Sequence, residues 1–455
     1  MTTCLRSQAL RETLLPASDL VNVDALCGQL ENLDNSLLGM NRTMPAPLWA
    51  RRGFQFGSSD AWKVAGRYLA DHADQWPMAV YVHIPFCDRR CPFCDCYAIP
   101  LHQGNADMAQ AYVSALVAEA HHWSRSGNLQ QRPVSTVHFG GGTVNSLPVA
   151  ALERIVTTLY KHLSINDRTE WALETTGSYL SRPWLSILRK MGFSRLHIGV
   201  QSLHDPTRKR LGRQQQAADV LQGIHHALEI GFVVSADMLY GVPEQGEWVF
   251  LNSLVSLAST AVDGISLYQL HRTKRNERFF AAYDPATTSA LRQFAQFAAG
   301  HELLEKQFGF QKNQFSHFAR PRDLNLYSRH AMRGEDLLAL GASADGGFGA
   351  LCYKHGDLKN FLSVPDVRQT LDGCLFKSAT EHQSDVVIAH LLANALPEDM
   401  LENDVVQSLV DDWIRSGWLK MEPPWTRLTL TGSWAIATMT DNVYARMQEL
   451  PSGWV

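Results

Sequence analysis

The chain has 455 residues, of which 45% are hydrophobic and 19% charged, and its formal net charge is −4. This length predicts two or three compact units with a sizeable core. The near-even charge balance gives no indication of nucleic acid or an anionic membrane surface as a partner. No apolar run reaches the roughly 18–20 residues that a membrane span needs. Charged residues interrupt the first 29 positions, which excludes a secretory signal peptide. We therefore expect a cytoplasmic protein.

The first predicted unit, residues 1–75, consists of helical pieces and shows no pattern typical of a reactive site. From residue 76 to 275, short apolar strands alternate with amphipathic helices, which predicts parallel βαβ units. Right-handed crossovers arrange such units as a barrel or as an open, doubly wound sheet. The strands are expected at 79–84, 136–139, 170–174, 195–200, 233–239 and 264–268, and the helices at 107–124, 148–163, 182–191, 217–230 and 247–259.

Residues 276–375 form a mixed, glycine-rich region that we interpret as a linking extension of the central unit. The last unit, 376–455, contains helical patterns at 385–395 and 403–416, a strand-like run at 426–431 and a final helix. Helices followed by a β-ribbon indicate a small winged-helix-like α+β module.

Polar and small residues gather where the predicted parallel strands end. A cysteine-rich loop follows the first strand, and a glycine run beginning at Gly140 follows the second. Glu174 ends the third strand, Gln201 follows the fourth, and Asp237 lies near the end of the fifth. Reactive groups of parallel α/β folds collect at these carboxyl ends, so we expect one site there.

Four of the eight cysteines fall within ten residues, at Cys87, Cys91, Cys94 and Cys96. In a large, unsecreted chain, clustered thiols indicate metal or redox chemistry. Three thiolates spaced Cys-x3-Cys-x2-Cys can hold a 4Fe–4S cubane and leave its fourth iron open. S-adenosylmethionine (SAM) can fill that corner through its amino and carboxylate groups. One electron then suffices to cleave its carbon–sulfur bond and release a 5′-deoxyadenosyl radical.

Two other metal sites stay open at this point. Zinc is one alternative, but Cys94 and Cys96 are awkwardly spaced for a single tetrahedral ion. A ferredoxin-like cluster with Cys96 as the fourth thiolate is the other.

The glycine run Gly140-Gly141-Gly142-Thr143 lets a ligand approach the backbone closely and suits the amino acid end of SAM. Asp237 could accept hydrogen bonds from ribose hydroxyls, while Glu174 and Arg213 could pair with the SAM ammonium and carboxylate. A helix cap or a weak surface ion pair is the ordinary alternative for each charged residue.

The chain resembles the HemN-like group of radical SAM proteins over about residues 78–450. The resemblance rests on Tyr81-Val-His-Ile-Pro-Phe-Cys87, the cysteine spacing and Val137-His-Phe-Gly-Gly-Gly-Thr143. It continues in Gly199-Val-Gln-Ser202, Leu211-Gly-Arg213, Asp237-Met-Leu-Tyr-Gly-Val-Pro243 and Ile265-Ser-Leu-Tyr-Gln-Leu270.

This resemblance implies a partial (β/α)6 TIM-like barrel. It implies that Cys87, Cys91 and Cys94 bind the cluster. The implied contacts of the cluster-bound SAM are Gly141, Gly142, Thr143, Glu174, Gln201, Arg213 and Asp237. Members of the group can hold a second SAM, and Tyr81 and Phe93 match positions beside it, where an aromatic face could meet a sulfonium.

Activity varies within the group. The N-terminal motif of coproporphyrinogen III dehydrogenases is absent, and Cys96 stands where the haem-chaperone (HemW) branch usually carries Phe. The middle region, Asn325-Leu-Tyr-Ser328 followed by a glycine-rich run, resembles the class C methyltransferase-like branch, which includes HutW and ChuW. Glu174-Thr-Thr-Gly departs from what that branch shows after its third strand.

The function we expect is methylation or another modification of an sp² carbon in a tetrapyrrole or aromatic substrate, with Tyr81 and Cys96 near the chemistry. A flavodoxin- or ferredoxin-type protein would supply the electron. A decarboxylating coproporphyrinogen oxidase is the first alternative, and a haem chaperone without turnover is the second.

Overall fold

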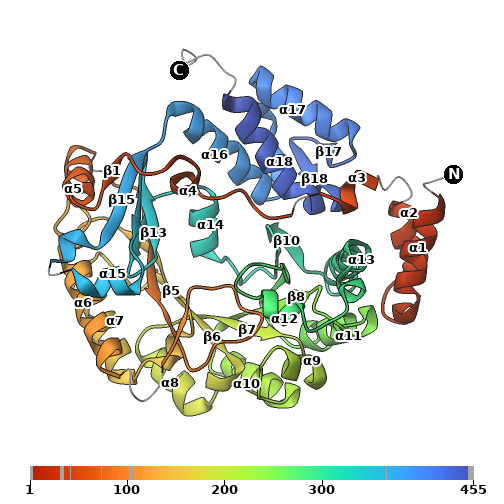
Figure 1. Cartoon of the computed structure of the whole chain (residues 1–455), viewed down its shortest axis with the longest axis horizontal. Coiled ribbons are helices and arrows are strands. Elements are labelled where there is room, and N and C mark those ends of the chain that lie inside the picture. The colour runs from red at the N-terminus through yellow and green to blue at the C-terminus, as the bar shows by residue number, and fades with distance from the viewer. Residues whose placement is uncertain are drawn as a thin grey trace.

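The structure is a computed structural model that describes residues 4–30, 35–40, 42–72, 74–101, 106–364 and 366–448. A large curved sheet forms its centre, with helices around the convex side and a short helix within the concave side (Figure 1). Within the described residues, no helix combines the length and apolar character that crossing a membrane requires.

Six parallel strands form the middle of the sheet, in the order β2-β5-β6-β7-β8-β9. Most of their residues are buried, because helices cover one face and the barrel interior lies against the other. The predicted partial barrel and its six strands are confirmed. The strands are β2 (Met78–Ile84), β5 (Val134–Gly141), β6 (Glu170–Thr176), β7 (Arg195–Gln201), β8 (Val233–Tyr240) and β9 (Gly264–Gln269).

The sheet continues beyond these six strands at both ends. A seventh parallel strand, β12 (Leu337–Leu340), pairs with β2, so residues from the glycine-rich region complete that side. Antiparallel strands then form both edges, ending at β1 on one side and β10 on the other. These strands are β13 (Asp345–Phe348), β14 (Leu351–His355), β15 (Leu371–Phe376), β1 (Phe56–Gly57), β11 (His317–Ala319) and β10 (Gln311–Gln314).

The five predicted connecting helices are present, each within one residue of its predicted start and within one of its end. Gly192 and Gly231, each one residue beyond the C-cap of one of these helices, adopt φ of +103° and +93°, a conformation that ends a helix and favours glycine. Helices flank the convex side of the sheet in Figure 1. They are α6 (Ala106–Ser124), α7 (Val149–His162), α8 (Arg182–Lys190), α10 (Ala217–Glu229) and α11 (Glu247–Ala258).

Helix α14 (Leu326–Met332) lies inside the curve of the sheet (Figure 1). Its Tyr327 ring stacks on His138 at 4.2 Å and on Tyr81 at 5.3 Å, between centroids. Its His330 reaches Ser135 near the start of β5. The helix therefore fills the amino-terminal part of the barrel interior. The other helices of the barrel region are α9 (Asp205–Arg210), α12 (Glu277–Phe280), α13 (Ala290–Glu302) and α15 (Leu358–Ser363).

The N-terminal segment is helical, as predicted. It comprises α1 (Cys4–Leu14), α2 (Val23–Gln29), α3 (Asn35–Leu38), α4 (Leu48–Arg52) and α5 (Ala61–Asp71).

The C-terminal module has the predicted helices and β-ribbon, with a three-stranded sheet in the order β16-β18-β17. Two predicted boundaries are wrong. The strand expected at 426–431 ends at Leu428, because Leu430 already begins the last helix, and the helix expected at 385–395 runs from Ala379 to Leu392. The module comprises α16 (Ala379–Leu392), β16 (Ala395–Pro397), α17 (Asp404–Arg415), β17 (Leu419–Glu422), β18 (Trp425–Leu428) and α18 (Leu430–Gln448).

Candidate functional site

A cavity of about 470 Å³, here called the rim cavity, opens at the carboxyl ends of the parallel strands. All but one of the predicted site residues line it, and Tyr81 is the exception. The predicted residues in the lining are Cys87, Cys91, Phe93, Cys94, Cys96, Gly141, Gly142, Thr143, Glu174, Gln201, Arg213 and Asp237.

The cysteine loop is fixed at its base by a pair of two-residue parallel strands, β3 (Phe86–Cys87) and β4 (Ile99–Pro100). The backbone N–H of Leu101 donates to the Cys87 carbonyl at 2.7 Å and closes the loop. Cys87, Cys91 and Cys94 are half-buried, whereas Cys96 is exposed. The loop thus holds three thiols at the wall of one cavity.

The segment that follows β9 holds this loop from its outer side. The buried Asn276 amide donates to the carbonyls of Phe93 and His271, both at 2.9 Å, and accepts from the Thr273 N–H at 2.8 Å. The Thr273 hydroxyl also donates to Asp95 at 2.8 Å. Sequence reasoning missed this contact, since it joins residues about 180 positions apart.

The glycine run brings the end of β5 against the cysteine loop. A Cβ atom on Gly142 would lie 2.2 Å from the Phe86 carbonyl oxygen and 3.1 Å from the Cys87 sulfur. Gly141 has a φ of +110°, which favours glycine, and a Cβ there would lie 2.6 Å from the His83 ring. Side chains at these positions would therefore displace the loop.

The Glu174 side chain fixes the backbone of the glycine run. Its carboxylate accepts from the Gly141 backbone N–H at 3.2 Å and contacts His138 Nε2 at 2.9 Å. Burial alone would raise the pKa of Glu174, but the hydrogen bonds from His138 and Gly141 lower it below its ordinary value. Glu174 is thus an anion facing the cavity.

Asp237 and Arg213 bring further charge into the rim cavity. Asp237 Oδ1 and Arg213 Nε are buried and have no hydrogen-bond partner among the described residues. Burial, followed by repulsion from Glu174, raises the pKa of Asp237 to about 7. Buried polar atoms are normally paired, so both groups have capacity left for a ligand.

Comparison with known proteins identifies the fold family. The sequence pattern of the Radical SAM superfamily matches residues 81–254, which include the cysteine loop, the glycine run and Asp237.

Residues 81–254 form a radical SAM domain.

Two curated relatives show how the radical SAM chain compares with named proteins. Oxygen-independent coproporphyrinogen III oxidase of Salmonella typhimurium is 29% identical over 59% of this chain and 61% of its own length. Anaerobilin synthase of Escherichia coli O157:H7 is 28% identical over 59% of this chain and 60% of its own. The chain thus aligns with about three fifths of each of these relatives.

Among solved structures, coproporphyrinogen III oxidase (HemN) from Escherichia coli superposes with a TM-score of 0.76. It covers 90% of this chain and 98% of its own at 23% identity, which shows a common fold. The radical SAM chain therefore has the HemN-like fold expected from its sequence.

The cofactors of the radical SAM superfamily are a 4Fe–4S cluster and SAM, and the rim cavity has the features that these groups need. Three thiols stand on one wall, and the glycine run leaves space beside Cys87. The unpaired Arg213 and Asp237 atoms and the anionic Glu174 complement a zwitterionic amino acid and a ribose. The residues present fit both groups.

The two aromatic residues predicted near a second SAM lie in different places. Phe93 lines the rim cavity, and its ring faces the Arg213 guanidinium at 5.8 Å. Tyr81 points into the barrel interior, where its hydroxyl meets His83 Nδ1 at 3.0 Å. The structure therefore brings Phe93, but not Tyr81, into the cavity lining.

Cys96 lies within hydrogen-bonding reach of Cys94 at the cavity wall. Within the described part of the chain, no three His, Cys, Asp or Glu side chains converge on a single metal ion. In a cubane each thiolate binds a different iron, so the ligands of a cluster do not have to converge on one ion.

His197 also lines the rim cavity and was missed by the sequence reasoning. Its Nε2 accepts a hydrogen bond from Arg195 Nε at 3.0 Å. Arg195, His197 and Gly199 alternate on one face of β7, so the two-residue period of a strand was the available signal.

Proposed function

We propose that this chain is an enzyme that cleaves SAM reductively and modifies an sp² carbon of a tetrapyrrole or aromatic substrate. The observation that carries the proposal is the rim cavity, where three thiols face Glu174, Arg213 and Asp237. Thiolates at one wall and hydrogen-bonding charges at the other suit a metal-bound ligand with amino acid and ribose parts.

Cys87, Cys91 and Cys94 would hold the cluster, and the other rim residues would hold SAM. When bound, the pair supplies one-electron cleavage of SAM to a 5′-deoxyadenosyl radical. Glu174 would pair with the SAM ammonium, Arg213 with its carboxylate, and Asp237 would accept from ribose hydroxyls. Gly141, Gly142, Thr143 and Gln201 would bring backbone and small polar groups to the same ligand.

Apolar groups beside the rim cavity favour a flat, ring-shaped substrate. Phe93 packs with Phe279 and Phe280 in a small apolar cluster that is separate from the main core. The Tyr268 side chain, at the carboxyl end of β9, is exposed. Coproporphyrinogen, for which one relative is named, is a tetrapyrrole. These features support a tetrapyrrole as the substrate class.

Methyl transfer with a second SAM is the reaction we favour, and Phe93 is the aromatic face available to that sulfonium. Oxidative decarboxylation is the second candidate, because the coproporphyrinogen oxidase relative is as similar to this chain as the anaerobilin synthase. The two reactions yield different products and can be separated directly.

The test is anaerobic reconstitution with iron and sulfide, followed by incubation with SAM, dithionite and either haem or coproporphyrinogen III. Mass spectrometry should detect 5′-deoxyadenosine. S-adenosylhomocysteine and a methylated haem product support methyl transfer, whereas carbon dioxide from coproporphyrinogen supports the oxidase. The Cys91→Ala variant is the control and should give neither product.

Two outcomes would overturn the enzymatic proposal: zinc in place of iron and sulfide, or a reduced cluster that never cleaves SAM. Stoichiometric haem binding without SAM turnover would support a chaperone instead. Repeating the assay with reduced flavodoxin or ferredoxin tests the proposed electron donor. Exposed Arg89, Arg90 and Lys209 line a groove beside the cysteine loop, where an acidic donor protein would find opposite charge.

Cys96 is proposed to assist a proton or hydrogen transfer after substrate attack, because its thiol lies at the cavity wall without being one of the three spaced ligands. Cys96→Ala should keep the iron content and 5′-deoxyadenosine formation while losing the modified product. Unchanged product yield would reject the role, and loss of the cluster would make Cys96 a fourth ligand.

A further inference from the structure

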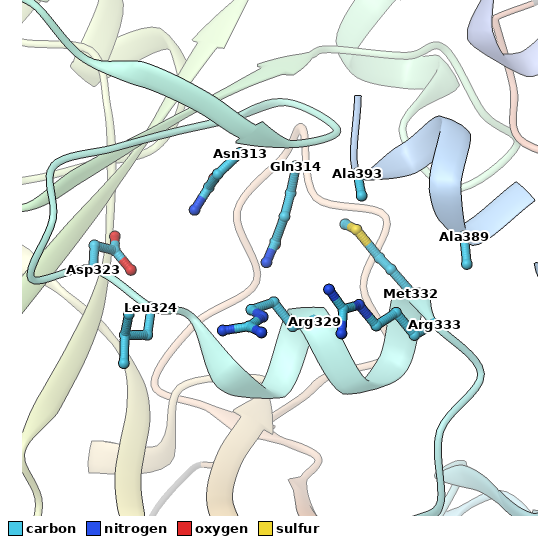
Figure 2. A pocket seen from close by; sticks show the side chains of 9 residues that line it. All are labelled: Asn313, Gln314, Asp323, Leu324, Arg329, Met332, Arg333, Ala389 and Ala393. Atoms are coloured by element: carbon cyan, nitrogen blue, oxygen red, sulfur yellow. The ribbon is translucent and has the colours of Figure 1, made fainter. Parts of the chain in front are cut away.

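A second cavity lies between β10, α14 and α16 (Figure 2). We call it the basal cavity, because Asp323 in its wall bonds to Arg195, the first residue of β7. Its volume is about 200 Å³, and it shares no lining residue with the rim cavity. Asn313, Gln314, Leu324, Arg329, Met332, Arg333, Ala389 and Ala393 complete its lining.

Two arginines give the basal cavity positive charge: Arg329 lies within α14, and Arg333 is its C-cap (Figure 2). Arg329 is half-buried, and among the described residues no acidic group pairs with its guanidinium. Arg333 has a loose contact with Glu335, at 3.6 Å. A half-buried guanidinium without an acidic partner suits a ligand that brings the negative charge.

Gln314 supplies a neutral donor to the same space. Its side chain is 3% exposed, and its Oε1 is held by Asn325 Nδ2 at 3.5 Å. Its Nε2 has no hydrogen-bond partner within the described residues, and in Figure 2 the amide points toward Arg329. A buried N–H left unpaired is unfavourable, so a ligand that offers an acceptor would be stabilised there. Asn313 adds an unpaired acceptor, Oδ1.

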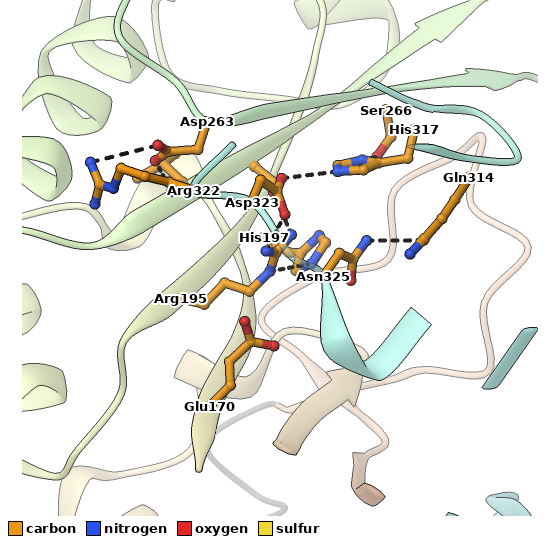
Figure 3. Close-up of polar contacts among 12 residues, drawn as sticks. Glu170, Arg195, His197, Asp263, Ser266, Gln314, His317, Arg322, Asp323 and Asn325 are labelled. Atoms are coloured by element: carbon orange, nitrogen blue, oxygen red, sulfur yellow. Dashed lines mark hydrogen bonds and ion pairs between the residues drawn. The ribbon is translucent and has the colours of Figure 1, made fainter. Parts of the chain in front are cut away.

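Asp323, the acid in the cavity wall, is paired with residues that do not line the basal cavity (Figure 3). It pairs with Arg195, and its Oδ2 meets His317 Nε2 at 2.9 Å and accepts from the Ser235 hydroxyl at 2.6 Å. These contacts leave no free carboxylate to neutralise Arg329. The cavity therefore keeps a net positive character.

We propose that the basal cavity binds a small oxyanion, a phosphate or a carboxylate. Its oxygens would accept from the Arg329 and Arg333 guanidinium groups and from Gln314 Nε2. The Asn313 oxygen can accept from a hydroxyl of the same ligand, as hydrogen phosphate provides. The volume admits a group of this size but not a nucleotide or a tetrapyrrole.

Isothermal titration calorimetry of the full chain with inorganic phosphate, and separately with acetate, at constant ionic strength tests the proposal. One saturable site is expected for at least one of the two anions. Arg329→Gln should weaken its affinity at least tenfold, and Arg329→Lys less, because lysine keeps the charge but not the planar fork. Gln314→Leu should weaken it by removing the buried donor.

The matched control is Arg322→Gln, since Arg322 is exposed, pairs with Asp263 at 3.6 Å and lies outside the cavity lining. Its anion affinity should equal that of the wild type. Phosphate binding alone identifies a phosphate site, and acetate binding alone a carboxylate site. No saturable binding of either anion, or equal affinity in Arg329→Gln and wild type, would overturn the proposal. Iron content after reconstitution verifies that each variant is folded.

Discussion

Glu174 brings a negative charge to the wall of the rim cavity. It is held by His138 and by the Gly141 backbone. Burial raises the pKa of Asp237, and the charge of Glu174 raises it further. A negative charge beside a half-open cavity is expected to bind an ammonium group.

Glu174→Gln should weaken SAM binding about tenfold, or about 1.4 kcal/mol, because it removes the charge and keeps the size of the side chain. Equilibrium dialysis with the reconstituted protein measures this. Glu170→Gln is the control, since Glu170 lies at the other end of the same strand. An equal loss in both variants would speak against a specific contact.

The raised pKa of Asp237 predicts that the free energy of unfolding depends on pH. Its pKa is about 7 in the fold and about 3.9 in an unfolded chain. Between these values the unfolded chain releases a proton that the folded chain keeps, so the folded state loses stability as the pH rises through this window. Asp237→Asn should stabilise the cluster-free chain at pH 8 by roughly 2–4 kcal/mol, and by little at pH 4. Urea unfolding at both pH values tests this; the same difference at both would contradict it.

Most of the rim residues could be predicted because strand ends are visible in sequence. Gly141, Glu174 and Asp237 each follow or end an apolar run, and parallel strands bring such positions to one edge. The inward direction of Tyr81 could not be predicted, because it depends on α14 entering the barrel and stacking on its ring.

At the scale of elements, the segment after β9 supports the cysteine loop through Asn276. Asn276→Ala would leave the Phe93 carbonyl and the Thr273 N–H without their partner. Each lost bond is worth about 0.5–1.5 kcal/mol. We expect the reconstituted cluster to lose iron to a chelator several-fold faster, as followed by the loss of its visible absorbance.

Asn252→Ala on α11 is the control for Asn276→Ala, because α11 packs outside the barrel and does not touch the loop. It should leave the rate of iron loss unchanged. A normal rate in Asn276→Ala would mean that the remaining contacts, β3 with β4 and Thr273 with Asp95, hold the loop without Asn276.

The central parallel strands were predicted well because burial on both faces makes each a continuous apolar run. The strands from β12 to β14 were not, because each has only four or five residues, and Gly346 and Gly347 lie inside β13. Helix α16 begins six residues before its predicted start. Ser378 and Glu381 form a capping box there, a signal that the apolar pattern alone did not reveal.

At the scale of the whole molecule, Arg195 and Asp323 join β7 to the chain that follows β11, 128 residues away (Figure 3). Both side chains are almost completely buried. Breaking such a pair on one side leaves a buried charge uncompensated. No local pattern predicts it, because the partners meet only once the sheet has formed.

Arg195→Met should destabilise the chain by about 3–5 kcal/mol. Burial alone would raise the pKa of Asp323, but His317 and Arg195 hold it well below its ordinary value. The stability from ionised Asp323 is therefore fully present above about pH 4 and is lost as the pH falls below that value. The difference between the variant and the wild type should shrink in the same range, as urea unfolding at pH 3 and 7 would measure.

Arg182→Met is the control for Arg195→Met, because Arg182 pairs with Glu229 on the surface. Its effect should stay below about 1 kcal/mol at either pH. Equal losses in the two variants would mean that the buried position of Arg195 does not matter.

The incomplete closure of the barrel has a consequence for solubility. A sheet that does not close on itself ends in two strands whose outer N–H and C=O groups can recruit another chain and start aggregation. Here those terminal strands are β1, with two residues, and β10, with four. Such short edges offer few backbone groups to a neighbour, so the open barrel carries little risk of strand-to-strand association.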